Sequence, residues 1–112
     1  MNTSNTVILI TNYGMGKSDE ALQIKLLIKY LQLITNGNLL PNSICFYADG
    51  VKCTTADSPV LPQLKTIEEK GVRLIVCSTC LEHLGRKAAV GIVGGMPDII
   101  EAQFTAEKVI SL

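Results

Sequence analysis

The chain has 112 residues, of which 47% are hydrophobic and 18% are charged, and its formal net charge is zero. This length predicts one domain, residues 1–112, and the hydrophobic content argues against intrinsic disorder. Scattered Lys and Arg with few aromatic residues argue against nucleic-acid binding, and no apolar run approaches the ~20 residues of a membrane span.

The N-terminus and the cysteines indicate where the protein works. The first residues, MNTSNT, are polar and lack the basic start and long apolar core of a secretory signal. We therefore expect a cytoplasmic protein whose four cysteines are reduced and do not form a disulfide framework.

Short β-branched apolar runs alternate along the chain with longer stretches that have helical periodicity. The predicted elements, in chain order, are a strand at 7–11, a glycine loop at 12–17, a helix at 18–35, a strand at 43–47, a long loop at 48–58, a helix from 59 or 62 to 71, a strand at 72–76, a short helix from 79 or 80 to 84, a strand at 90–93, a helix to about 104 and a strand at 108–111. This alternation predicts a three-layer α/β/α sandwich, doubly wound as in flavodoxin, with about five mostly parallel strands.

The first predicted helix is more apolar than one buried face requires. Ser18 is its predicted N-cap and Gly37 its terminator. Its polar residues form only a narrow stripe, which consists of Lys25, Lys29, Gln32 and Asn36. We expect a second layer or another subunit to cover the remaining apolar surface.

Three predicted segments follow the carboxyl ends of strands, where parallel sheets bind ligands. They are residues 12–17, 48–58 and 77–80. The glycine loop contains GMGKS, Gly14 to Ser18, which partly matches the phosphate-binding pattern G-x-x-x-x-G-K-[ST]. Thr11 stands where the first glycine of that pattern belongs, so the sequence favours a tight turn before a helix, whose N–H groups could still bind an anion.

Cys77, Cys80 and His83 form a C-x-x-C-x-x-H motif at the end of the third predicted strand. A zinc site would need a fourth ligand, and no second close-spaced pair supplies one, so no metal is expected. A dithiol redox pair in the thioredoxin arrangement fits better, with Cys80 as a thiolate stabilised at the helix start, with Lys52, Arg86 or His83 as cationic neighbours, and with a second thiol that resolves a mixed disulfide. Two ordinary core thiols remain the alternative.

Several stretches together resemble DsrE-like proteins, and within them the YedF and YchN type. They are VILITNYGMGKSDEALQ, the region from SICFYADGVKC to STCLEHLG, and VGIVGGMPDII onward. The clearest motif matches are Ala48 to Lys52 (ADGVK) and Cys77 to Cys80 (CSTC). The resemblance implies a compact α/β domain that assembles into dimers, trimers or hexamers. In sulfur-relay members, a cysteine at a strand end carries sulfur as a persulfide, and the spacing to Gly85 assigns that role to Cys77, whereas the helix-start argument favours Cys80.

The predicted function is therefore a sulfur carrier or sulfurtransferase component without a cofactor, which exchanges sulfur with a donor or acceptor protein. The alternatives are a non-catalytic oligomeric binding module and a small dithiol redox protein. The residues predicted to carry the chemistry are Cys77 and Cys80, and those predicted to bind the substrate are Asn12, Gly14, Gly16, Lys52, Cys53, Ser78 and Thr79.

Overall fold

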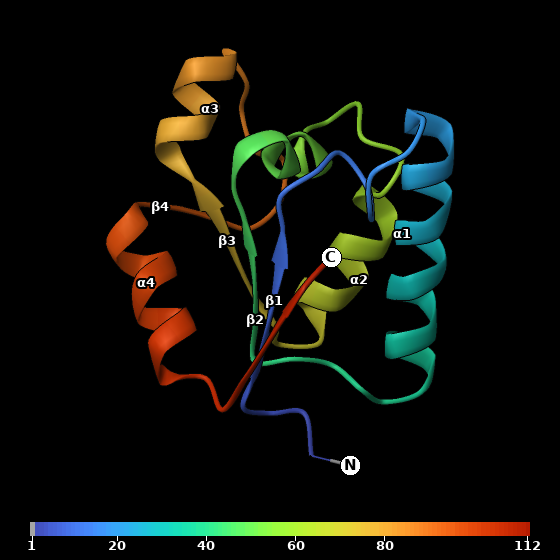
Figure 1. Ribbon diagram of the computed structural model, residues 1–112, viewed down its shortest axis with the longest axis vertical. Helices are drawn as coiled ribbons and strands as arrows, with labels where there is room; N and C mark the ends of the chain where they lie inside the picture. Colours follow the sequence, from blue (N-terminus) through green and yellow to red (C-terminus); the bar gives the residue numbers. More distant parts are fainter. Residues whose placement is uncertain (1) are drawn as a thin grey trace.

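A five-stranded parallel sheet lies between helices in the computed structural model, which describes residues 2–112 (Figure 1). The elements in chain order are β1 (Thr6–Ile10), α1 (Glu20–Asn36), β2 (Ser43–Phe46), the 3₁₀ helix η1 (Ala48–Thr54), α2 (Leu61–Glu69), β3 (Arg73–Cys77), α3 (Ser78–Leu84), β4 (Ile92–Gly94), α4 (Met96–Thr105) and β5 (Lys108–Ser111).

The strand order is β4-β3-β2-β1-β5, and every neighbouring pair is parallel. Strands β1 to β4 step across the sheet in one direction, so right-handed crossovers place α1 and α2 on the same face (Figure 1). The return from β4 to β5 crosses the whole sheet and places α4 on the opposite face. This arrangement confirms the predicted doubly wound α/β/α sandwich. The strand order reverses at β1, because β2 lies on one side of β1 and β5 lies on the other.

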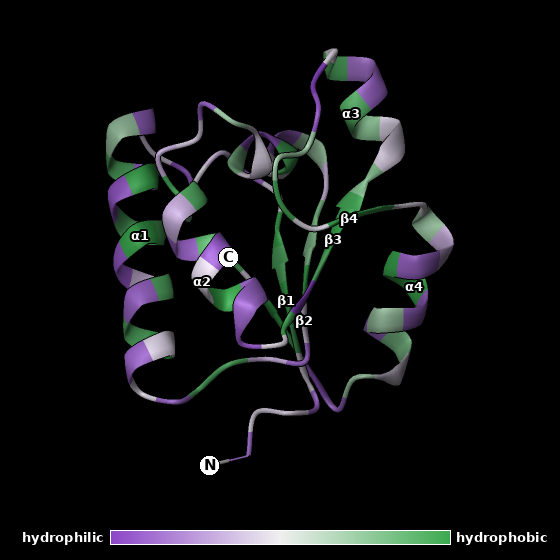
Figure 2. Cartoon of the chain, turned by 180° about the vertical axis from the view of Figure 1, so that it is seen from behind, coloured by the Kyte–Doolittle hydropathy of each residue, from purple (hydrophilic) through white to green (hydrophobic). Residues whose placement is uncertain are grey.

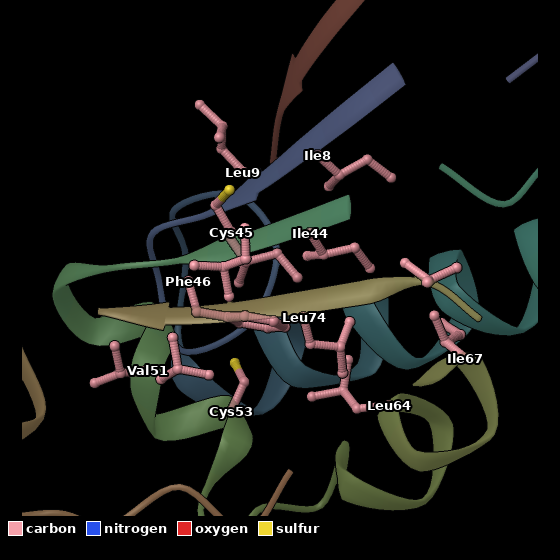
Figure 3. Close-up of a cluster of buried hydrophobic side chains, with 14 of the residues drawn as sticks. Ile8, Leu9, Ile44, Cys45, Phe46, Val51, Cys53, Leu64, Ile67 and Leu74 are labelled. Carbon is pink, nitrogen blue, oxygen red and sulfur yellow. The ribbon is translucent and has the colours of Figure 1, made fainter. Parts of the chain in front are cut away.

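The inner strands are almost wholly apolar because both faces of the sheet are covered there, whereas most residues of the edge strands β4 and β5 are exposed. All residues of β1 and β2 are buried, and Figure 2 shows these strands as hydrophobic while the helices have mixed colouring. Cys45 lies beside Leu9 on one side of the sheet, and Cys53 lies with Val51 on the side that α2 covers (Figure 3). Both thiols therefore belong to the packed core.

Two local predictions were wrong. The N-cap of α1 is Asp19 rather than Ser18, because the Asp19 carboxylate accepts a hydrogen bond from the Leu22 N–H at 3.0 Å. The predicted loop at 48–58 contains the 3₁₀ helix η1. A 3₁₀ helix has i to i+3 hydrogen bonds, so its sequence does not show the apolar periodicity of an α-helix. None of the helices described in residues 2–112 combines the length and the apolar character needed to cross a membrane.

Candidate functional site

Strand β3 leads directly into α3 and delivers two thiols to the carboxyl end of the sheet. Cys77 is the last residue of β3 and the N-cap of α3, and only 1% of its surface is exposed. Cys80 lies one turn further on and is half-buried. Cys45 and Cys53 are 0% exposed, so Cys80 is the most accessible of the four free cysteines.

Cys80 lines a cavity of about 350 Å³ between α3 and η1. The lining is mainly apolar, and its residues are Ala48, Asp49, Thr79, Cys80, His83 and Leu84. A cavity of this size is at the lower end of the range for small-molecule sites, and it is large enough for a sulfur atom and the end of a donor side chain.

The backbone of η1 places a hydrogen-bond donor on the Cys80 sulfur. The Ala48 N–H donates to Cys80 Sγ with an N···S distance of 3.2 Å. Ala48 has a φ of 52°, a left-handed conformation that costs free energy for a residue with a side chain. Close packing holds this turn in place, because Gly50 lies so near β1 that a Cβ there would be 1.9 Å from the Ile10 carbonyl oxygen.

The pKa of Cys80 is raised above the ordinary thiol value, first by partial burial and then by the neighbouring Cys77 thiol. The Ala48 N–H acts in the opposite direction, because it stabilises the thiolate. The expectation that the helix start and nearby cations would give a low-pKa thiolate was therefore wrong. Lys52 is not among the groups that shift the pKa of Cys80, and its ammonium pairs with the Asp49 carboxylate at 3.1 Å.

Residues 5–112 match the model of the DsrE/DsrF-like family. The chain belongs to the DsrE/DsrF-like family. Similar solved structures cover nearly the whole of this family member, and two of them are the ychN protein from E. coli and MTH1491 from Methanobacterium thermoautotrophicum. The ychN protein is 16% identical in sequence, and the match covers 97% of this chain and 99% of the ychN chain, with a TM-score of 0.69. MTH1491 is 19% identical, and the match covers 96% of this chain and 97% of the MTH1491 chain, with a TM-score of 0.69.

A third solved structure, BT1422 from Bacteroides thetaiotaomicron, is 20% identical over 96% of this chain and 93% of its own, with a TM-score of 0.66. The structures MTH1491 and BT1422 are titled as proteins of unknown function. No curated protein matches the chain. At these identities the solved structures establish the fold of this DsrE/DsrF-like protein and leave its chemistry to be argued from the site.

The glycine loop of this DsrE/DsrF-like chain reaches the same edge of the sheet but does not line the Cys80 cavity. The Asn12 amide donates to the Gly16 carbonyl at 2.9 Å, and Gly14 packs against Gln23 so closely that a Cβ would lie 2.4 Å from its backbone. The Cys53 thiol donates to the Asn12 carbonyl at a S···O distance of 3.6 Å. Burial raises the pKa of Cys53 to about 11, so it is not a second exposed thiol.

The predicted site residues therefore do not all gather at one cavity. Thr79 lines the Cys80 cavity, whereas Ser78 lines a separate cavity against β4. Within residues 2–112, no three or more His, Cys, Asp or Glu side chains gather so that they could hold a metal ion.

Sequence reasoning did not place Ala48, Asp49 or Leu84 among the site residues, although all three line the Cys80 cavity. Ala48 acts through its backbone N–H, and no side-chain pattern announces a donor of that kind. The nearest signal was the ADGVK stretch of the family resemblance, which begins at this residue.

Proposed function

We propose that this protein is a cytoplasmic sulfur carrier that holds sulfane sulfur as a persulfide on Cys80. The observation that carries the proposal is the position of the Cys80 sulfur, which faces a cavity and accepts a hydrogen bond from the Ala48 N–H at 3.2 Å. Membership of the DsrE/DsrF-like family supports a role in sulfur relay. Four free cysteines in the described chain are in keeping with a reducing compartment.

Loading requires one exchange of S–S bonds. The Cys80 thiolate attacks the outer sulfur of a donor persulfide, R–S–SH, on a partner protein. A bond forms between Cys80 Sγ and that sulfur, the S–S bond of the donor breaks, and the donor thiolate leaves with the proton that Cys80 released. The imidazole of His83, which lines the same cavity, is a base that can accept this proton on the way.

Discharge can follow two routes. An acceptor thiolate can attack the outer sulfur, which returns Cys80 to the thiolate and gives an acceptor persulfide. Alternatively, the Cys77 thiolate attacks Cys80 Sγ, hydrosulfide leaves, and a Cys77–Cys80 disulfide forms. In the second route the two cysteines supply the two electrons that reduce the sulfane sulfur to sulfide, and a dithiol reductant must then reset the pair. Cys77 lies close enough to raise the pKa of Cys80, which supports its role as the resolving thiol.

The test is the intact mass of the protein after incubation with a small-molecule persulfide donor. We expect an adduct of about 32 Da, one sulfur atom, that dithiothreitol removes. The adduct should persist in Cys77→Ser and be lost in Cys80→Ser, and these two variants are matched because both remove one thiol from the same turn. An adduct that survives in Cys80→Ser, or that never forms in Cys77→Ser, where the resolving thiol is absent, would rule out the proposed carrier.

The same proximity of the two thiols favours a dithiol redox protein as the second candidate. That reading predicts a Cys77–Cys80 disulfide that forms reversibly at a cytosolic potential without added persulfide. A non-catalytic binding module instead predicts slow alkylation of all four cysteines and no adduct. Thiol titration against a glutathione redox buffer distinguishes these outcomes from persulfide loading.

A further inference from the structure

Helix α1 has a row of leucines that the rest of the chain does not cover. Leu22, Leu26 and Leu33 are 41%, 42% and 61% exposed. An α-helix turns by about 100° per residue, so these three side chains leave the helix axis in directions that differ by at most about 40°. The buried Leu27 and Leu31 lie on a different side of the helix. We call these three residues the α1 stripe.

Helix α4 has a second such row. Met96, Ile100 and Phe104 are 46%, 47% and 84% exposed, and they follow one another every four residues. The buried residues of this helix, Ile99 and Ala102, lie on its other side. We call Met96, Ile100 and Phe104 the α4 stripe. Large apolar side chains aligned on a helix surface typically mark a contact with another macromolecule.

The two stripes lie on helices on opposite faces of the sheet, and α4 packs on β3 and β4 (Figure 1). Among residues 2–112, strand β5 pairs only with β1, so its other edge has no partner strand there. Tyr30, which follows Leu26 by four residues on α1, shares a cavity with Ile110 of β5, so the α1 stripe lies toward this open edge. The stripes also match in length, about 16 Å for α1 and about 12 Å for α4 at 1.5 Å per residue.

The charges beside the stripes differ in sign. After Glu20, the charged residues of α1 are Lys25 and Lys29, whereas those of α4 are Asp98 and Glu101. Lys29 is next to Leu22 around the helix, and Glu101 borders Phe104. Neither side chain has a salt-bridge partner among the described residues. Packing α1 on α1 would bring lysine to lysine, and packing α4 on α4 would bring glutamate to glutamate, whereas α1 on α4 brings opposite charges together.

We propose that a second copy of this chain docks its α4 stripe on the α1 stripe. The contact joins two unlike surfaces, so each copy offers its α4 stripe to one neighbour and its α1 stripe to another. Opposite charges at Lys29 and Glu101 select this pairing over the two like pairings, and the six apolar side chains supply the buried surface. This inference does not depend on the chemistry of Cys80.

The test is a complementation experiment that uses sedimentation velocity. We expect the wild-type protein to assemble beyond a monomer, and Leu26→Asp and Ile100→Asp each to sediment as monomers. An equimolar mixture of the two variants should form dimers, because the intact α4 stripe of one can dock on the intact α1 stripe of the other. Ile92→Asp, at an apolar residue of β4 that is 59% exposed and belongs to neither stripe, should assemble as the wild type does.

A charge exchange tests the same contact without an added charge in an apolar stripe. Lys29→Glu should weaken assembly at least tenfold, and the double variant Lys29→Glu/Glu101→Lys should restore it. A monomeric wild-type protein, single variants that assemble normally, or a mixture that stays monomeric while both variants show the wild-type circular dichroism would each overturn the proposal. Loss of assembly in Ile92→Asp would also overturn it.

Discussion

Cys80 is a thiol whose reactivity is set by its nearest neighbours. Its pKa is raised by partial burial and by Cys77, and it is lowered by the Ala48 N–H. Removing the Cys77 thiol should therefore lower the pKa of Cys80 and increase its thiolate fraction at neutral pH. We predict that Cys77→Ala reacts with iodoacetamide several-fold faster at pH 7.5, because the thiolate fraction changes tenfold for each unit of pKa.

The measurement is the alkylation rate of Cys80 between pH 6.5 and 10, followed by mass spectrometry of the intact chain. Rates for the wild type and Cys77→Ala should converge at high pH, where both thiols are ionised, and differ most below the pKa of the wild-type thiol. Cys45→Ala is the control, since Cys45 is buried and is not among the groups that shift the pKa of Cys80. Equal rates at every pH would show that Cys77 does not influence the reactive thiol.

The sequence could identify the C-x-x-C pair and its place after a strand, but not which thiol is accessible. The answer depends on tertiary contacts, because Cys77 is covered as the last residue of an interior strand while Cys80 emerges beside η1. The predicted cationic neighbour Lys52 illustrates the same limit. It is close to the site along the sequence, but a carboxylate three residues away pairs with its ammonium.

At the level of elements, η1 controls the geometry of the site. Gly50 lies against the Ile10 carbonyl, so a methyl group there would force η1 away from β1. We predict that Gly50→Ala lowers the free energy of unfolding by about 3 kcal/mol or more, as overpacking against backbone does. Displacement of η1 should also weaken the bond from the Ala48 N–H and slow the alkylation of Cys80 at neutral pH.

Urea denaturation and the alkylation rate together test this role of η1. Gly85→Ala is the matched control, because Gly85 has a φ of 63° but nothing within 4 Å of its added Cβ. We expect it to lower the unfolding free energy by only about 1 kcal/mol, the cost of a left-handed alanine. A Gly50→Ala protein as stable as Gly85→Ala, with normal Cys80 reactivity, would contradict the prediction.

The inner strands β1, β2 and β3 were predictable because each contains a continuous apolar run between turn residues, as a sheet covered on both faces requires. The excess of apolar residues on α1 was also visible, and the structure places it in the exposed leucines of the α1 stripe. The 3₁₀ helix was not predictable, since its buried residues, Gly50, Val51, Cys53 and Thr54, follow neither helical nor strand periodicity. Its position is fixed by contacts with β1 and α3, which are remote in the sequence.

At the level of the whole molecule, the buried thiols couple stability to alkaline pH. Burial raises the pKa of Cys45 and of Cys53 from 9.0 to about 11. Between these values the folded protein binds protons that the unfolded chain has already released. The stabilisation from each buried thiol is therefore fully present below pH 9 and is lost as the pH rises through about 11.

We predict that the free energy of unfolding falls steeply between pH 9 and 11, with about 2 to 3 kcal/mol of the loss due to each thiol, since one unit of pKa is worth about 1.4 kcal/mol. Urea denaturation of the wild type and of Cys45→Ala/Cys53→Ala over this range provides the measurement. Removal of two buried side chains lowers stability at every pH, so the slopes rather than the absolute values are compared. Tyr30, whose pKa is also raised by burial, titrates in both proteins and cancels in the comparison. Cys53 is one of the groups that raise the pKa of Tyr13, so the double variant also relieves part of that shift, which makes its slope shallower still. The variant should show the shallower slope, and parallel curves would mean that the two sulfurs reach solvent in the folded protein.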